Sequence, residues 1–380
     1  MTVRPHAGGS SQHSIGVCRM NCCRWLVMTF GLILVGNSSA WAWNDLGHIT
    51  VAQIAFRQLS GDERLAVVAI LKQHPHFDTY FRKPDGLDVP DDEWLFMRAA
   101  TWCDYVRPPR DLDRSQIKTH PIHKFHRGPW HYINYPFHAG DAPGAPLAAQ
   151  LPPTEDDKTD IVRQLKLGRD VLLGTVAQDP GIALDVTPEQ NRAVRLCWLF
   201  HLTGDLHQPL HATAFVDTRR FPGPYHGDAG GNLTIIRTSA QARTSNLHSY
   251  WDGLLGATAG WRDGNNAERL ASDIKRCRTQ ADLLSHGALS AERLPELQEH
   301  PEVVNWAEES FRQAVAVAYD GGQLKFASKK EVDENQILAN QVPILPPLLQ
   351  EKARATANKR IALAGYRLAR QIQDIAGPRQ

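Results

Sequence analysis

Apolar residues recur every three or four positions along most of the chain, a spacing that predicts amphipathic helices. Ser, Thr, Asp or Asn stands near the start of most of these segments, where such residues cap helices. Only residues 230–238, GGNLTIIRT, have the glycine lead-in and β-branched run of a strand. The pattern therefore predicts an all-α protein with at most a small β-hairpin. The predicted helices cover residues 46–59, 61–74, 92–106, 154–174, 187–207, 246–255, 266–284, 301–319 and about 348–375.

Three long loops, rich in Pro, Gly and His, interrupt the predicted helices at residues 107–131, 135–153 and 209–232. Long loops within a compact domain are often functional. No repeat, low-complexity tract or linker divides the chain. We therefore expect one domain over residues 43–380.

The first 42 residues have the features of an export signal. Arg19 and Arg24 precede the apolar run LVMTFGLILVG, which is followed by small residues and an Ala-x-Ala site at residues 40–42. A membrane span needs about 18 consecutive apolar residues, and this run is shorter. Cleavage would leave Trp43 as the first residue. We expect the mature protein to be secreted or periplasmic, without a membrane anchor.

The net charge of the mature chain limits how it could bind nucleic acid. Removing residues 1–42 takes away three arginines and no acid, which leaves 39 basic residues against 41 acidic ones. This balance offers no broad polycationic surface, so a nucleic-acid partner would be held by local groups or metal ions.

The three remaining cysteines, Cys103, Cys197 and Cys277, allow at most one intramolecular disulfide. We expect at least one of them to be a small buried apolar residue.

The 17 histidines include several at close spacing with aspartate, most densely in HLTGDLHQPLH, residues 201–211. His201 and Asp205 are four residues apart and therefore share one face of a helix. Pro209 ends that helix, so that His211 can turn back toward the same face. A lone pair at this spacing is more often a surface pair or a buried structural histidine, but the added His211 favours a metal site.

A second pair repeats the spacing, because His248 and Asp252 are also four residues apart, in NLHSYWDGLL. Asp104 in ATWCDYVR and His131 in PWHYIN offer further ligands among aromatic residues. The alternatives are an ion pair of Asp104 with Arg107 and a half-buried structural role for His131. Two His/Asp pairs on separate helices nevertheless favour a metal centre.

The predicted cleavage gives the new amino terminus a role in this hypothesis. His48 lies five residues after Trp43. An α-amine has a pKa of about 7.7–8.0 and becomes a neutral nitrogen ligand when a metal displaces its proton. The indole of Trp43 would pack into the core and fix the amine. Alternatively, His48 is a polar residue of the first helix and Trp43 an ordinary hydrophobic contact.

Seven motifs stand in the order Trp43, the GH of WNDLGH, TWCD, PWHYIN, HLTGDLHQPLH, GGN and NLHSYWD. In this order they closely resemble the secreted zinc-dependent nucleases of the S1/P1 type. That family shares a superfamily with bacterial zinc-dependent phospholipase C. The resemblance covers about Trp43 to Asp252, and the last third of the chain matches only in being helical.

The resemblance implies a mainly helical fold with three Zn²⁺ ions in a cleft. The implied ligands are nitrogen and oxygen donors without a thiolate, which suits zinc in an oxidising compartment. For the first zinc they are Asp104, His131, His201 and Asp205. For the second they are His211, His248 and Asp252. The third would take the amine and carbonyl of Trp43 with His48, and would share Asp205 as a bridging carboxylate.

The resemblance also implies an endonuclease that cleaves single-stranded DNA and RNA to 5′-phosphate products through a zinc-activated water, with 3′-nucleotides as further substrates. Asp104 would position the water, and Asp205 would bridge two ions. Arg107 would contact phosphate or form a helix-end ion pair. Gly253 stands where many family members have a base-binding asparagine, so base preference is open. We expect no obligate protein partner.

Two other functions remain as alternatives. A zinc-dependent phospholipase C uses the same chemistry, but its superfamily members have glutamate where Asp252 stands. A secreted zinc-binding protein without turnover would need no open metal position.

Within the 107–131 loop, an alternative ligand to His131 would be His120, His123 or His126.

Overall fold

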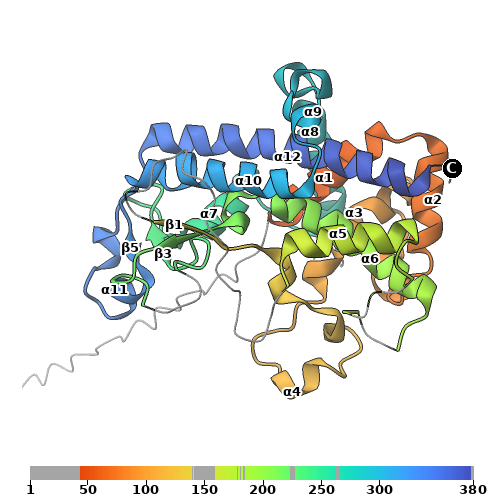
Figure 1. Cartoon of the computed structure of the whole chain (residues 1–380), viewed down its shortest axis with the longest axis horizontal. Coiled ribbons are helices and arrows are strands. Elements are labelled where there is room, and N and C mark those ends of the chain that lie inside the picture. The colour runs from red at the N-terminus through yellow and green to blue at the C-terminus, as the bar shows by residue number, and fades with distance from the viewer. Residues whose placement is uncertain are drawn as a thin grey trace, which may run out of the picture. The chain divides into compact units, whose positions relative to one another are not determined.

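The structure is a computed structural model that describes residues 43–138, 140, 159–177, 179, 181–182, 185–222, 227–261 and 266–377. The predicted export signal, residues 1–42, lies outside these ranges, as does the start of the predicted 154–174 helix. The described chain is one mainly helical domain (Figure 1). The predicted fold class is therefore confirmed.

Helix α1 (Asp45–Gln58) lies at the centre of the domain. It packs against α12 (Pro347–Ala376), α3 (Asp91–Tyr105) and α8 (Ala267–Leu284). Its residues from Asp45 to Ala55 are all buried. A helix that is buried on every side belongs to the core of a domain, so a polar residue on α1 is enclosed by its neighbours.

Helix α6 (Pro188–Leu206) forms the second part of the core, between α5 (Ile161–Leu173) and α3, and also contacts α2 (Gly61–Leu71) and α12. Figure 1 shows α12 as the long blue helix beside α10 (Val303–Gln313). The remaining α-helices are α4 (Arg114–Ile117), α7 (Leu247–Asp252), α9 (Glu296–Glu299) and α11 (Lys329–Asp333). Short 3₁₀ helices are η2 (His123–Phe125), η3 (Gly128–His131), η4 (Pro209–Ala212), η5 (Gly287–Leu289), η6 (Ala291–Arg293), η8 (Asp320–Gly322) and η9 (Ala339–Gln341), and π-helical turns are η1 (Phe77–Phe81) and η7 (Ala314–Ala318).

Side-chain caps fix the starts of most of the predicted helices. The Asn44 side chain accepts a hydrogen bond from the Gly47 N–H at the start of α1. Ser60 forms a capping box at α2, and Thr187 forms one at α6. The sequence predicts a helix over residues 92–106 with the preceding Asp91 as its cap. This cap is wrong, because α3 includes Asp91 and follows Pro90, which has no side chain that can accept the bond.

The strand content is larger than the single hairpin that the sequence predicts. The predicted strand exists as β3 (Thr234–Ile236), which lies between β4 (Ser245–Asn246) and β5 (Ala327–Ser328) in an antiparallel sheet. A second sheet pairs β1 (Tyr135–His138) with β2 (Thr213–Val216) in parallel. Pro136 obscures β1 in the sequence, yet proline is tolerated there because both strands of a two-stranded sheet are edge strands.

The three cysteines of the described chain are free and buried, which confirms the expectation of small core residues. The largest fully buried side chains include Trp43, Trp102, Trp198 and Trp251. Within the described ranges, no helix has the length and apolar character that crossing a membrane requires.

The contact between α1 and α12 depends on Gly365. A Cβ atom there would lie 2.5 Å from Cβ and Cγ2 of Ile54 and 3.2 Å from the Val51 carbonyl oxygen. We predict that Gly365→Ala lowers the free energy of unfolding by about 1–3 kcal/mol, because the overpacking outweighs the gain in helix propensity. Chemical denaturation measures this change. Gly61→Ala, where a Cβ meets nothing within 4 Å, is the matched control; equal stability of both variants would contradict the prediction.

Candidate metal centre

The eight His and Asp residues predicted as side-chain ligands converge in the core from six separate elements. Each is at most 5 % exposed. They are His48 of α1, Asp104 of α3, His131 of η3, His201 and Asp205 of α6, His211 of η4, and His248 and Asp252 of α7. In three groups, one donor atom from each member lies within 4.8 Å of the others: His48, Asp104 and His201; His131, His201 and Asp205; and His211, His248 and Asp252. The first two groups share His201.

Asp205 is the common neighbour of three histidines. Its Oδ1 lies 3.2 Å from Nε2 of His48. Its Oδ2 lies 2.8 Å from Nδ1 of His131 and 3.4 Å from Nε2 of His201. A carboxylate with histidines at both of its oxygens lies in the position of a ligand that bridges two cations.

The second group lies where η4 meets α7. Nε2 of His248 is 3.7 Å from Oδ2 of Asp252 and 3.1 Å from Nε2 of His211. The Gln208 side chain donates to the other oxygen, Oδ1, of Asp252 at 2.8 Å. This residue was in the sequence motif, but nothing in the pattern indicated that it orients a ligand. Its hydrogen bond leaves Oδ2 of Asp252 facing the histidines.

Backbone carbonyls fix the orientation of three histidine rings. Nδ1 of His201 lies 2.8 Å from the Ala100 oxygen, Nδ1 of His211 lies 2.6 Å from the His131 oxygen, and Nδ1 of His248 lies 2.6 Å from the Gly230 oxygen. A carbonyl oxygen only accepts hydrogen bonds, so each Nδ1 carries the proton and each Nε2 presents a lone pair. Metal-ligating histidines are commonly held by such a bond from the other nitrogen.

These tautomers place two lone pairs opposite each other, because Nε2 of His211 faces Nε2 of His248. Burial keeps the pKa of His211 well below its usual range, and the neighbouring His248 adds to this effect. A cation held by both nitrogens would satisfy both lone pairs. Within the described part of the chain, Nε2 of His131, Oδ1 of Asp205 and Oδ2 of Asp252 are also buried without a hydrogen bond. These atoms fit a divalent metal bound through nitrogen and oxygen.

Burial shifts the acids and bases of the centre in opposite directions. It raises the pKa of Asp205 to about 8 and that of Asp252 well above its usual range. It lowers the pKa values of His131 and His201. Without a cation, the buried carboxylates therefore tend to hold protons that a metal ion would replace.

Two glycines allow the close approaches that the centre requires. At Gly204, a Cβ atom would lie 2.8 Å from Nδ1 of His48. The absence of that atom lets the His48 ring lie against α6, stacked on His201 at 3.9 Å. At Gly47, a Cβ atom would lie 2.6 Å from Cβ of Trp43, so the indole lies against the first turn of α1. The sequence motifs contained both glycines without indicating these contacts.

A cavity of about 380 Å³ gives access to the centre. Its wall includes His131, His211 and His248, three of the predicted ligands. The other lining residues are Arg107, His126, Gly128, Pro129, Tyr132, Asn134, Leu210, Ala229, Gly230 and Asn232. Arg107 also lies 3.6 Å from Oδ1 of Asp104, which is the expected helix-end ion pair, and its contact with phosphate stays a prediction. The cavity offers both apolar and polar walls.

The loop histidines suggested as alternatives to His131 lie differently. His120 and His123 stack on each other at 4.2 Å, and Nδ1 of His123 lies 3.0 Å from the Val106 oxygen. His126 lines the cavity, and burial lowers its pKa to about 4. None of the three belongs to a three-donor group of the described residues. His131 is the residue that joins such a group.

The start of α1 lies beside the second ligand group. Trp43 is fully buried, and the backbone N–H of Asn44 donates to the carbonyl oxygen of Asp252 at 3.3 Å. Trp43, the residue that follows the predicted cleavage point, is thus part of the core.

The pKa shifts predict how pH affects the metal-free protein. The raised pKa of Asp205 stabilises the fold fully below its ordinary value of 3.8, and this contribution declines as pH rises through about 8. The lowered pKa values of His131 and His201 affect the stability only below pH 6.5. We therefore predict that the chelated protein loses stability from pH 6.5 to pH 8, and that zinc raises stability more at pH 8 than at pH 6.5. Thermal unfolding with and without zinc measures both effects; a zinc effect that does not grow with pH would contradict the assignment.

Comparison with known proteins adds one result. A protein-family model described as S1/P1 nuclease matches residues 43–377. No curated protein matches the chain. The family match extends well beyond the motifs of residues 43–252 and includes α12.

Proposed function

Since this chain belongs to the S1/P1 nuclease family and is thereby a hydrolytic nuclease that acts on nucleic acids, we propose that it is a three-zinc phosphodiesterase specific for single strands. It cleaves single-stranded DNA and RNA to 5′-phosphate products and also acts on 3′-nucleotides. The observation that carries this proposal is the convergence of three His/Asp groups on one buried centre beside an open cavity.

The donor set supports zinc and the proposed division into three sites. His131, His201, Asp104 and Asp205 would hold one ion. His211, His248 and Asp252 would hold the second. The third would use His48, the amine and carbonyl of Trp43 and the second oxygen of Asp205. Zinc bound there would supply a Lewis acid and a nucleophile at neutral pH.

The residues around the cavity would bind and orient the phosphodiester. The Arg107 guanidinium lines the cavity and can contact a phosphate oxygen. The Asp104 carboxylate, 3.6 Å from Arg107, can accept a proton from the attacking water and orient it. These two residues and Asp205 are the catalytic set that we propose.

Preference for single strands would come from the shape and walls of the cavity. Tyr132 and Leu210 are among its lining residues, and an unstacked base can pack against such walls whereas a paired base cannot. Gly253 ends α7 directly after Asp252, where a Cβ atom would lie 3.4 Å from the Ser249 oxygen. Because Gly253 has no side chain, the residues that line the cavity would determine the base preference.

We also propose that residues 1–42 are removed as an export signal, that residues 43–380 form the nuclease domain, and that the protein acts outside the cytoplasm. Asp252 in place of glutamate argues against a phospholipase C. An open cavity beside the ligands argues against a zinc-binding protein without turnover.

The function is tested with protein that begins at Trp43. We predict that it releases 5′-mononucleotides from single-stranded DNA and RNA, that it dephosphorylates 3′-AMP, and that a zinc chelator abolishes both activities. Phosphatidylcholine is the control substrate, and Asp205→Asn is the control variant, which should lose two ions because one carboxylate serves two sites. Lipid hydrolysis without nucleolysis, or nucleolysis that persists without zinc, would contradict the proposal.

A second prediction concerns the amino terminus. A chain with one glycine before Trp43 should bind one zinc fewer and lose at least about tenfold in activity, because its amine is displaced from His48 and Asp205. Metal analysis and turnover measure the two effects. The same glycine added after Gln380 is the matched control. Equal zinc content in the extended and the processed chains would exclude the amine as a ligand.

A further inference from the structure

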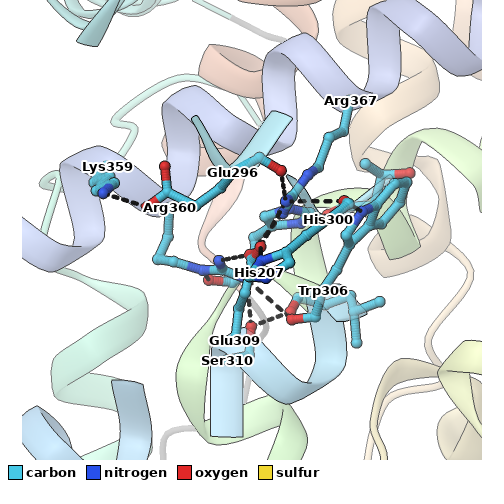
Figure 2. A network of polar contacts seen from close by, with 11 residues as sticks. His207, Glu296, His300, Trp306, Glu309, Ser310, Lys359, Arg360 and Arg367 are labelled. Atoms are coloured by element: carbon cyan, nitrogen blue, oxygen red, sulfur yellow. Dashed lines mark hydrogen bonds and ion pairs between the residues drawn. The ribbon is translucent and has the colours of Figure 1, made fainter. Parts of the chain in front are cut away.

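A buried network of charges lies where the ligand-bearing helix α6 ends (Figure 2). Glu309 of α10 lies between Arg360 and Arg367 of α12. Arg367 donates to its two carboxylate oxygens at 2.6 and 2.7 Å, and Arg360 donates to it through Nη1. Arg360 is 3 % exposed and Arg367 is 4 % exposed. None of the residues that line the cavity of the centre belongs to this network.

Arg360 also binds the end of α6 directly. Its Nε donates to the His207 carbonyl oxygen at 3.2 Å. Its Nη2 donates to the Ser310 hydroxyl at 2.6 Å, and that hydroxyl donates to the Leu206 carbonyl oxygen. The last carbonyls of an α-helix have no partner within the helix. Arg360 and Ser310 supply partners for two of them.

His207 completes the attachment from the side of the helix. Its Nδ1 lies 2.7 Å from the Thr203 carbonyl oxygen, and its Nε2 lies 2.9 Å from Nη1 of Arg367. The Gln371 side chain of α12 donates to the Thr203 hydroxyl at 3.0 Å. The last turn of α6 is thus held by three side chains of α12.

The network carries a net positive charge at the negative end of a helix dipole. Burial alone would raise the pKa of Glu309, but hydrogen bonds and charges from Arg367 and Arg360 outweigh it and lower that pKa to about 2. Burial lowers the pKa of Arg360 to about 10. At neutral pH, two guanidinium groups therefore face one carboxylate. The excess positive charge is favourable beside the C-terminal carbonyls of α6.

The residues held by this network lie between metal ligands in the chain. Leu206 and His207 directly follow Asp205, and Gln208, which orients Asp252, comes next. The chain then turns through Pro209 to His211. A shift of the Leu206 and His207 carbonyls would therefore displace Asp205 in one His/Asp group and His211 in another.

We propose that Arg360 is a positioning residue of the metal centre, because it fixes the turn between α6 and η4 from which Asp205, Gln208 and His211 reach the metals. This inference rests on the proposed function. A purely structural role would instead join α10 to α12 without affecting the affinity for zinc. The two roles predict different zinc affinities for a variant that is fully folded.

The test measures zinc affinity by competition with a chelator, at a temperature well below unfolding. We expect Arg360→Met to raise the zinc dissociation constant about 10–100-fold, in line with the loss of other groups that orient metal ligands. Arg360→Lys keeps the charge near Glu309 but not the forked geometry, so it should raise the constant less. Ser310→Ala, which removes one small hydroxyl, tests the same turn if Arg360→Met does not fold.

Two controls separate positioning from stability. Arg312→Met removes an arginine from α10 whose ion pair with Glu308 is partly exposed, and it should leave zinc affinity unchanged. Leu284→Ala, a buried change on α8 outside the network, should lower stability without lowering zinc affinity. A zinc dissociation constant within about twofold of that of the unchanged protein for folded Arg360→Met would overturn the inference, as would the same result for Ser310→Ala if Arg360→Met does not fold. An unchanged protein that binds no zinc would overturn the proposed function itself.

Discussion

The structure depends on one unfavourable arrangement that a cation makes favourable: carboxylates buried among neutral imidazoles. Asp205 is fully buried between three histidines, and burial raises its pKa to about 8. Nearby, two histidine lone pairs face each other at 3.1 Å. The facing lone pairs are costly by themselves, because buried polar groups without partners destabilise a fold. Both features would suit the ligands of divalent ions.

The rest of the fold holds these groups in position. Helix α6 presents Asp205 and His201 on one face, and Gly204 admits the His48 ring beside them. Backbone carbonyls orient the other nitrogen of three histidines. The long helix α12 then fixes the end of α6 through Arg360. Packing and hydrogen bonds around the site thus hold its His and Asp side chains in place.

The proximity of several of these His and Asp residues could be predicted because their spacing is local. His201 and Asp205 share a helix face, His248 and Asp252 repeat the spacing, and Pro209 explains how His211 returns. Contacts between distant segments could not be predicted in this way. Arg360 reads as an ordinary basic residue of a C-terminal helix, yet it binds a carbonyl 153 residues earlier. Likewise, the pairing of β1 with β2 could not be predicted, because Pro136 makes residues 135–138 an unfavourable strand sequence.

The most direct test of the metal centre is a crystal structure of the protein beginning at Trp43, with anomalous diffraction measured at the zinc edge. We expect three separate zinc peaks, with the ion of the second group about 2.0–2.2 Å from Nε2 of His211 and of His248. We also expect an open coordination position toward the cavity. Absence of zinc between those two nitrogens, or ions fully enclosed by protein donors, would contradict it.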